Sequence, residues 1–501
     1  MISRPRFKPW FRCETIPSEG VILLSERGPV LLPGRLYQLV APLLDGQHTV
    51  DEIADCLRGK LAAADAFYAI EILRRRGYLT DVDSSLPSEQ AAFWDIVDID
   101  GDAATRLLQE AAVSVRSFGK IDPTALLALL TSLGIRIDDD ADRWIALTDD
   151  YLRDELRAFN QKALKQNRPW LLTKPVGSEL WLGPLFIPGK TGCWTCLAHR
   201  LQGARKVESY LQTVRKTNDP FSVLPAGLPS TAHTAFSIAA TEIAKWIAGG
   251  RNECLEGQIV TLNTLSLSTQ SHVLVRRPQC PSCGNSEAFA AGLSAPVVLQ
   301  SREKHFTDDG GHRGFSPQDT LKKLEHHISP VTGIVSSLYP TSSWAGEESL
   351  VPTYATVHNV VEIFSGESSG VDFLRSSLQA SVTGKGKGSV QAKASALCES
   401  IERYSGVFQG DEARFRARFS DLGEAAIHVN DGMLFSERQF RDRKQWNAGP
   451  LFSWVPEPFD VNAEIEWSPV WSLTFNVRRY VPTAYCYYKL FAEVFRLVHA
   501  R

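Results

Sequence analysis

The stretch that decides the fold of this chain is GKGKGSVQAKASALCESIERYSG, residues 384–406. Residues 391–405 contain good helix formers and no proline, which predicts a helix. On that helix Ser395, Glu399 and Glu402 follow the i, i+4, i+7 spacing and share one face. Adjacent carboxylates repel each other unless a positive group lies between them, and Mg²⁺ with phosphate oxygens would meet that need. The alternative is a solvated helix face, because exposed glutamate pairs are common on helices.

Basic residues accompany this acidic face. Arg403 directly follows Glu402, and Lys385 lies in the flexible glycine-rich turn that precedes the helix. The backbone of such a turn, together with an ammonium group, can meet phosphate. Cys398 precedes Glu399, but no histidine in the motif would activate it as a nucleophile. We therefore assign no catalytic residue in this stretch.

The composition is that of an ordinary globular protein. The 501 residues are 44% apolar and 22% charged, with a formal net charge of -3. This charge gives no general attraction to nucleic acid or to an anionic membrane. The first residues, MISRPRFKPWFR, lack the apolar segment of a signal peptide, and no apolar run is long enough to span a bilayer. We therefore expect a cytoplasmic protein that binds neither nucleic acid nor membrane.

Residues 1–82 predict a small winged-helix-like domain of the α+β class. The apolar runs 21–24 and 30–32 flank a turn and are typical of a β-hairpin. Residues 49–52, Thr-Val-Asp-Glu, have the capping-box pattern of a helix start. A further helix, from about Asp65 to Arg76, is expected to carry Phe67, Ile70 and Leu73 inward.

Two partners remain open for this domain. Winged helices often read DNA, but Arg74-Arg-Arg76 is its only basic run, and acidic residues are interspersed throughout. That run could equally meet an acidic peptide, added as a strand to the edge of the hairpin. The sequence disfavours DNA, and the arginine run stays open between a peptide contact and a solvated helix end that the helix dipole favours.

Residues 91–290 alternate helical stretches with short strand-like runs, which predicts an α/β domain. Two C-x-x-C pairs, Cys193 with Cys196 and Cys280 with Cys283, are the spacing that tetrahedral zinc prefers. Four thiolates leave zinc no open position, so we predict a structural ion. Four ordinary cysteines and a redox dithiol are the alternatives.

The string GKG followed by QAKASALCESIERYSG resembles the first ATP-binding motif of the YcaO family. Residues 329–335, SPVTGIV, and residues 478–488, RRYVPTAYCYY, resemble that family too. Fused azoline-forming cyclodehydratases, the cyanobactin heterocyclases among them, place a winged-helix domain and an E1-like zinc domain before the YcaO domain. The resemblance implies a multidomain α+β and α/β protein, with a leader-peptide-binding domain at 1–82, an E1-like zinc domain at 91–290 and a YcaO domain at 316–501.

The resemblance also implies a function. ATP and Mg²⁺ would drive the cyclodehydration of cysteine, serine or threonine residues in a ribosomally made precursor peptide, giving thiazoline or oxazoline rings in natural-product biosynthesis. Glu399 and Glu402 would hold magnesium, Lys385 and Arg403 would face phosphate, and Ser395 would donate a hydrogen bond to the nucleotide or cap the metal shell. We expect a homodimer, and a separate flavin dehydrogenase for any oxidation, because the chain has no flavin-binding signature.

Two departures from the family lead to further expectations. The second acidic motif and the proline-rich tail of the family are not found, and residues 490–501 no longer resemble it. We therefore expect an incomplete YcaO domain, with a catalytically inactive leader-binding scaffold as the alternative to an enzyme. Residues 113–122 contain a single glycine where an adenylating E1-like domain needs a glycine-rich turn, which predicts that the middle domain does not bind ATP.

Overall fold

The computed structural model describes the fold of most of the chain. The residues described are 3–80, 86–217, 220–221, 223–285, 292, 295–308, 311–341, 351–359, 371, 374–375, 381–408, 410, 412–448 and 455–487. Contacts divide the chain into one unit of residues 1–112, 128–137 and 240–252, and a second unit of residues 113–127, 138–239 and 253–501. The three-domain division expected from the sequence stays a prediction.

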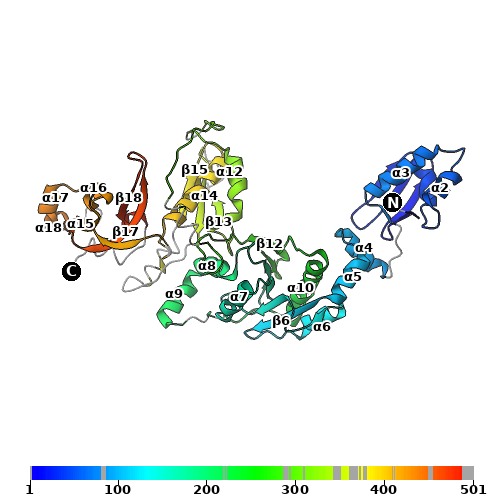
Figure 1. The fold of residues 1–501 in the computed structure, drawn as a ribbon, viewed down its shortest axis with the longest axis horizontal. Helices are drawn as coiled ribbons and strands as arrows, with labels where there is room; N and C mark the ends of the chain where they lie inside the picture. Colours follow the sequence, from blue (N-terminus) through cyan, green and yellow to red (C-terminus); the bar gives the residue numbers. More distant parts are fainter. Residues whose placement is uncertain are drawn as a thin grey trace. The chain divides into compact units, whose positions relative to one another are not determined.

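The N-terminal part contains a three-stranded sheet, a two-stranded sheet and helices (Figure 1). Its elements are β1 (Arg6–Phe7), β2 (Arg12–Ile16), β3 (Gly20–Leu24), β4 (Val30–Pro33), α1 (Arg35–Val40), η1 (Ala41–Leu43), α2 (Val50–Cys56), α3 (Ala63–Arg75), β5 (Leu79–Thr80), α4 (Ser88–Ile96) and α5 (Gly101–Glu110). The predicted hairpin is confirmed, because β3 pairs antiparallel with β4 and Val21 lies opposite Leu32. An unpredicted strand, β2, pairs with the other side of β3.

The helices of this part follow the sequence signals except at one position. The capping box is present, with Thr49 and Glu52 each bonding the backbone of the other. Phe67 is 40% exposed, so its predicted inward position is wrong. The inward positions predicted for Ile70 and Leu73 are confirmed, because both are buried on α3 together with Ala66, and Phe67 lies one position beside this stripe.

The middle of the chain forms a seven-stranded mixed sheet with helices, which confirms the α/β class. Its elements are β6 (Ala112–Phe118), α6 (Thr124–Ser132), β7 (Arg136–Ile137), β8 (Arg143–Thr148), α7 (Glu155–Lys165), β9 (Trp170–Lys174), β10 (Glu179–Phe186), α8 (Trp194–Ala204), α9 (Lys206–Arg215), α10 (Pro229–Gly249), β11 (Gln258–Asn263) and β12 (Ser268–Val273). The strand order is β12-β11-β10-β9-β8-β6-β7. The β6, β8 and β9 pairings are parallel, whereas β9 to β12 run antiparallel.

The C-terminal part contains two three-stranded antiparallel sheets, β13-β14-β15 and β16-β17-β18. Its elements are α12 (Pro317–Leu324), η2 (Glu325–His327), β13 (Val335–Pro340), β14 (Thr353–His358), β15 (Ser381–Lys385), α14 (Ser389–Gly406), β16 (Phe415–Arg418), α15 (Phe419–Leu422), η4 (Gly423–Ala425), α16 (Val429–Met433), α17 (Glu437–Arg441), α18 (Arg443–Trp446), β17 (Glu464–Ser472), β18 (Val477–Pro482) and α19 (Thr483–Cys486). The predicted helix is therefore confirmed as α14, which lies against the first sheet beside α12 (Figure 1). Residues 488–501, which include the expected divergent tail, lie outside the described residues.

The glycine-lysine run before α14 is not the flexible turn expected from the sequence. Gly384 and Lys385 end β15. A Cβ atom on Gly384 would lie 2.1 Å from the backbone nitrogen of Ala396, and one on Gly386 would lie 2.6 Å from the side chain of Gln391. These glycines therefore allow the end of β15 to pass close to α14, where no side chain fits.

Replacing Gly384 with alanine is expected to destabilise the protein. The added methyl group would collide with the α14 backbone, and overpacking of this kind costs about 1–3 kcal/mol. Urea unfolding of the two proteins measures the difference. Gly388→Ala is the matched control, because a Cβ atom there meets nothing within 4 Å. Equal unfolding midpoints for all three proteins would contradict the close packing of β15 on α14.

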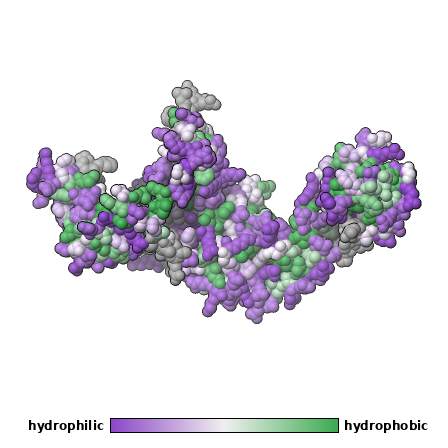
Figure 2. All heavy atoms as spheres, turned by 45° about the horizontal axis from the view of Figure 1, so that its top comes forward, coloured by the Kyte–Doolittle hydropathy of each residue, from purple (hydrophilic) through white to green (hydrophobic). Residues whose placement is uncertain are grey.

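The exposed surface mixes hydrophobic and hydrophilic residues in small groups on the face drawn in Figure 2. Among the described residues, the most exposed large apolar side chains lie in loops, with Leu224 94% and Leu265 83% exposed. Leu31 differs, because it is 62% exposed on the edge strand β4. Among the described residues, no helix has the length and apolar character needed to cross a membrane.

Candidate nucleotide and metal sites

A cavity of about 560 Å³ lies over one face of α14. Ser395, Glu399, Glu402 and Arg403 line it from α14, and residues of α12 line another part. Burial explains this orientation, because α14 turns a stripe of small and apolar residues to the sheet and leaves the acidic face outside. The structure thus brings four of the five predicted ATP-site residues together at a cavity of ligand-binding size.

An ion pair occupies part of this cavity. Arg403 donates from Nε and Nη2 to Oε1 of Glu399, at 3.1 and 2.9 Å. The two side chains are one helical turn apart and remain 52% and 37% exposed. Among the described residues, Glu402 has no ion-pair partner and its side chain is exposed. A cation that enters would therefore find Glu402 available and would compete with Arg403 for Glu399.

Three residues that the sequence analysis missed also line the cavity. Phe306, Arg313 and Phe315 come from the segment before α12, between two predicted domains. Phe306 and Arg313 hold each other through two backbone hydrogen bonds, of 3.1 and 2.8 Å. Arg313 adds a positive charge to a cavity with two carboxylates. The signal that could have found it is a basic residue between aromatic residues directly before a helix cap.

Lys385 is the predicted residue that the structure does not bring to the cavity. It is the last residue of β15, its side chain is exposed, and it does not line the space over α14. The glycines on either side of it serve close packing rather than phosphate contact.

The four paired cysteines meet in one cluster. Their sulfur atoms all lie within 4.8 Å of one another. Cys193 is 3.7 Å from Cys280, and Cys196 is 3.5 Å from Cys283. These separations are too long for disulfides, which need about 2 Å. They fit a tetrahedron of thiolates with Zn–S bonds of about 2.3 Å, whose edges are about 3.8 Å.

The chain around the cysteines holds both knuckles in place. Cys193 precedes the first residue of α8, and the Trp194 amide there donates to Oδ1 of Asn160 at 3.1 Å. The second knuckle is held by Arg276, whose Nε donates to the carbonyl oxygen of Cys283 at 3.1 Å. Because the partners come from different elements, the cluster geometry is set by the folded domain rather than by either knuckle alone.

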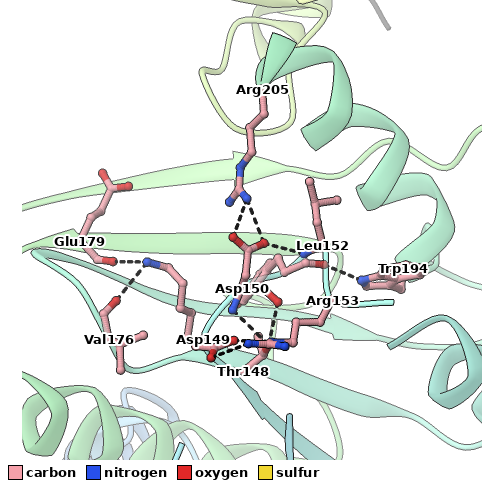
Figure 3. A network of polar contacts seen from close by, with 11 residues as sticks. Thr148, Asp149, Asp150, Leu152, Arg153, Val176, Glu179, Trp194 and Arg205 are labelled. Carbon is pink, nitrogen blue, oxygen red and sulfur yellow. Dashed lines mark hydrogen bonds and ion pairs between the residues drawn. The ribbon is translucent and has the colours of Figure 1, made fainter. Parts of the chain in front are cut away.

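The carboxyl end of β8 carries paired charges (Figure 3). Arg205 donates from Nη1 to both carboxylate oxygens of Asp150, at 2.9 and 2.7 Å. Arg153 donates from Nε and Nη2 to Asp149, at 2.5 and 2.9 Å. Partial burial raises the pKa of Asp149, but hydrogen bonds from Arg153 and from the backbone lower it more, so the net shift is downward. The Asp149 carboxylate is therefore held ionised.

Asp149 also contacts the turn after β6, where an adenylating domain of this type would bind phosphate. The turn after β6 contains Gly119, and a Cβ atom there would lie 2.2 Å from the Asp149 carboxylate. Lys120 donates its backbone N–H to the same carboxylate, at 3.1 Å. The Asp149 carboxylate thus accepts the Lys120 backbone N–H, which is the kind of group that would otherwise donate a hydrogen bond to a phosphate. That the middle domain does not bind ATP stays a prediction.

A groove of about 480 Å³ lies beside β2 in the N-terminal part. Arg6, Cys13 and Thr15 line it together with Asp45. β2 and β4 are the two edges of their sheet, so each offers backbone groups to an added strand.

The chain matches two described families. Residues 383–497 match the family described as YcaO cyclodehydratase, ATP- and Mg²⁺-binding. Residues 6–81 match a winged helix-turn-helix domain. The first match extends past residue 490, where we expected the resemblance to have ended, so that expectation is wrong. A search among curated proteins found no match.

Two solved structures resemble nearly the whole chain. A heterocyclase in complex with substrate and cofactor is 41% identical, with a TM-score of 0.81 over 97% of this chain and 65% of that one. Together with the family match at residues 383–497, this similarity supports a relationship to the YcaO-type cyclodehydratases. The heterocyclase TruD is 37% identical, with a TM-score of 0.73 over 97% of this chain and 64% of its own. The chain therefore spans slightly less than two thirds of the length of each of these heterocyclases.

Proposed function

We propose that this protein is an ATP-dependent cyclodehydratase that forms thiazoline or oxazoline rings from cysteine, serine or threonine residues of a ribosomally made peptide. The cavity that gathers Ser395, Glu399, Glu402 and Arg403 carries this proposal. Its α14 wall lies within the part of the chain that matches an ATP- and Mg²⁺-binding family. The similarity to a heterocyclase in complex with substrate and cofactor supports the same reaction class.

The proposed reaction makes few chemical demands on the protein. The thiol or hydroxyl of the substrate adds to the preceding amide carbonyl, and its proton passes to solvent. The resulting oxyanion takes the γ-phosphoryl group of ATP, which leaves ADP. Loss of phosphate from carbon, with loss of the amide proton, then completes the ring. Such transfer depends on positioning and charge neutralisation more than on a protein nucleophile.

Different residues of the cavity would contact the magnesium ion and the phosphates. Glu399 and Glu402 would hold Mg²⁺, which neutralises phosphate charge when bound. Arg403 and Arg313 would face the phosphates, and Ser395 would donate a hydrogen bond to the nucleotide. Lys385 has no part in this arrangement, because it does not line the cavity.

Incubation with Mg-ATP and a candidate precursor peptide tests the function. A peptide that loses one water molecule per ring, with one ADP released for each, supports it. Tight peptide binding without ADP release would select the second candidate, a leader-binding scaffold. The Glu399–Arg403 ion pair favours that candidate, because it engages one of the two proposed magnesium ligands.

We also propose a structural zinc ion at Cys193, Cys196, Cys280 and Cys283, in a middle domain of the E1-like type. The fit of the sulfur separations to a zinc tetrathiolate supports the ion. A homodimer, a separate flavin dehydrogenase and a cytoplasmic location stay predictions.

The winged-helix domain is proposed to bind the leader of the precursor peptide by strand addition. Leu31 places an exposed apolar side chain on the edge strand β4, where an added strand would cover it. Leu31→Lys is expected to weaken leader binding about tenfold, because the covered apolar contact is lost and a charge is placed at the edge. Fluorescence anisotropy with a labelled leader peptide measures the change.

Tyr68→Lys is the control for this experiment. Tyr68 is also 62% exposed in the same domain, but it lies on α3 rather than on the sheet. Its replacement is expected to leave leader affinity unchanged. If both variants bind the leader as the unaltered protein does, the β4 edge is not the docking strand, and the β2 edge becomes the next candidate.

A further inference from the structure

Arg200 links the cysteine cluster to the helix of the proposed nucleotide site. It lies on α8 four residues after Cys196, so the two side chains share one face of that helix. Although charged, Arg200 is only 7% exposed. Its guanidinium carbon lies 4.9 Å from the centre of the Tyr404 ring. Tyr404 belongs to α14 and follows Arg403 directly.

The guanidinium of Arg200 is incompletely satisfied. Among the residues that the structure describes, its Nε and Nη1 have no hydrogen-bond partner. An arginine stays charged inside a protein, and a buried charge needs an opposite charge close by. Among the described residues, Arg200 contacts the aromatic ring of Tyr404, but no carboxylate forms an ion pair with it.

A second buried arginine lies at the same cluster. Arg277 is 5% exposed, and its backbone N–H donates to Sγ of Cys196 at 3.5 Å. Burial lowers the pKa of Arg200, with repulsion from Arg277 as a further cause, while Tyr404 and Cys196 act in the opposite direction. Arg277 thus contacts Cys196 through its backbone, and its charge lies close enough to Arg200 for the two to repel.

A zinc ion held by four thiolates carries two net negative charges. Two buried guanidinium groups would balance them. We propose that Arg200 is a positioning residue with two contacts: it offsets the charge of the zinc-bound thiolates together with Arg277, and it holds Tyr404, so that zinc occupancy sets the position of α14. This inference rests on the zinc ion and on the nucleotide site proposed above.

The first arm of the test measures zinc. Arg200→Met removes the charge and keeps a long apolar side chain, whereas Arg200→Lys keeps the charge. We expect zinc release to a chelator, followed with a colour indicator, to be about tenfold faster in Arg200→Met. We expect Arg200→Lys to restore most of the retention. Arg215→Met, on the exposed end of α9, is the control and should release zinc as the unaltered protein does.

The second arm measures Mg-ATP binding by calorimetry. Arg200→Met and Tyr404→Leu should each weaken it about fivefold, because the contact between guanidinium and ring is lost in both. Only Arg200→Met should change zinc release, because Tyr404 does not belong to the cysteine cluster. If Arg200→Met changes both zinc release and Mg-ATP binding while Tyr404→Leu changes only Mg-ATP binding, Arg200 connects the two sites. A residue that merely stabilises the fold would not give this difference.

The outcomes distinguish failure of the Arg200 inference from failure of the proposed nucleotide site. Unchanged zinc release and Mg-ATP affinity in a folded Arg200→Met protein would overturn the inference alone. If Arg200→Met does not fold, rapid zinc loss from Arg200→Lys, or from Tyr404→Leu, would overturn it. An unaltered protein that holds zinc but binds no Mg-ATP would remove the proposed function and the coupling to α14. An unaltered protein without zinc would overturn the role of Arg200 at the cluster.

Discussion

Replacing Cys280 with serine is expected to remove the zinc ion and to unfold the middle region well below the melting temperature of the unaltered protein. Cys280 pairs across the cluster with Cys193, 87 positions earlier in the chain. The metal would therefore join the start of α8 to the loop after β12. Structural zinc contributes roughly 10–16 kcal/mol to folding in small zinc domains. That is comparable with the whole stability of a typical domain, about 5–15 kcal/mol.

The packing around the cluster explains why the loss would spread. Cys193, Cys196 and Cys280 belong to a buried hydrophobic cluster, together with Trp194 and Leu197 of α8. If the cluster opens, α8 loses the anchor of its first turn. Elemental analysis should find one zinc per chain in the unaltered protein and none in Cys280→Ser, and thermal unfolding followed by circular dichroism should show the lower midpoint.

Cys254→Ser is the matched control, because Cys254 is exposed and lies outside the cluster. It should keep its zinc and its melting temperature. A Cys280→Ser protein that holds a full equivalent of zinc and melts with the unaltered protein would refute the proposed site.

The cysteine site could be predicted from sequence because its signal is local. Each C-x-x-C pair presents two thiolates on one turn, whatever the rest of the fold does. The acidic face of α14 is local in the same sense, because the spacing of Ser395, Glu399 and Glu402 places them together on any straight helix. Such features depend on helix and turn geometry alone.

Other features depend on tertiary packing and could not be read in this way. The run around Lys385 looked like a phosphate-binding turn, but Gly384 lacks a side chain because α14 passes close to it. Arg313 reaches the cavity only because the segment before α12 folds back through its bridge with Phe306. Neither the contact of Gly384 with α14 nor the bridge between Phe306 and Arg313 follows from a periodicity or spacing in the sequence.

Glu402→Gln is expected to weaken Mg-ATP binding and ring formation about a hundredfold. Glutamine keeps the size of the side chain but removes the charge that would hold Mg²⁺. Removing one group that stabilises charge in an oxyanion hole costs about 10²–10³ in rate, and we expect a loss of that order here. Glu402 is the better choice for this test because Glu399 also pairs with Arg403. Calorimetry with Mg-ATP gives the affinity, and ADP release gives the rate.

The role of Glu402 is isolated by repeating the titration without magnesium. If Glu402 binds the metal, Glu402→Gln should bind metal-free ATP as well as the unaltered protein or better, because a negative charge near the phosphates is gone. An equal loss with and without magnesium would mean that Glu402 does not act through the metal. Glu424→Gln, an exposed glutamate on η4, should change neither titration. Alkylation of Cys398 gives a second measurement of nucleotide binding that does not depend on calorimetry. Cys398 lines the same cavity, so bound Mg-ATP should slow its alkylation in the unaltered protein. In Glu402→Gln, Mg-ATP should not slow this alkylation.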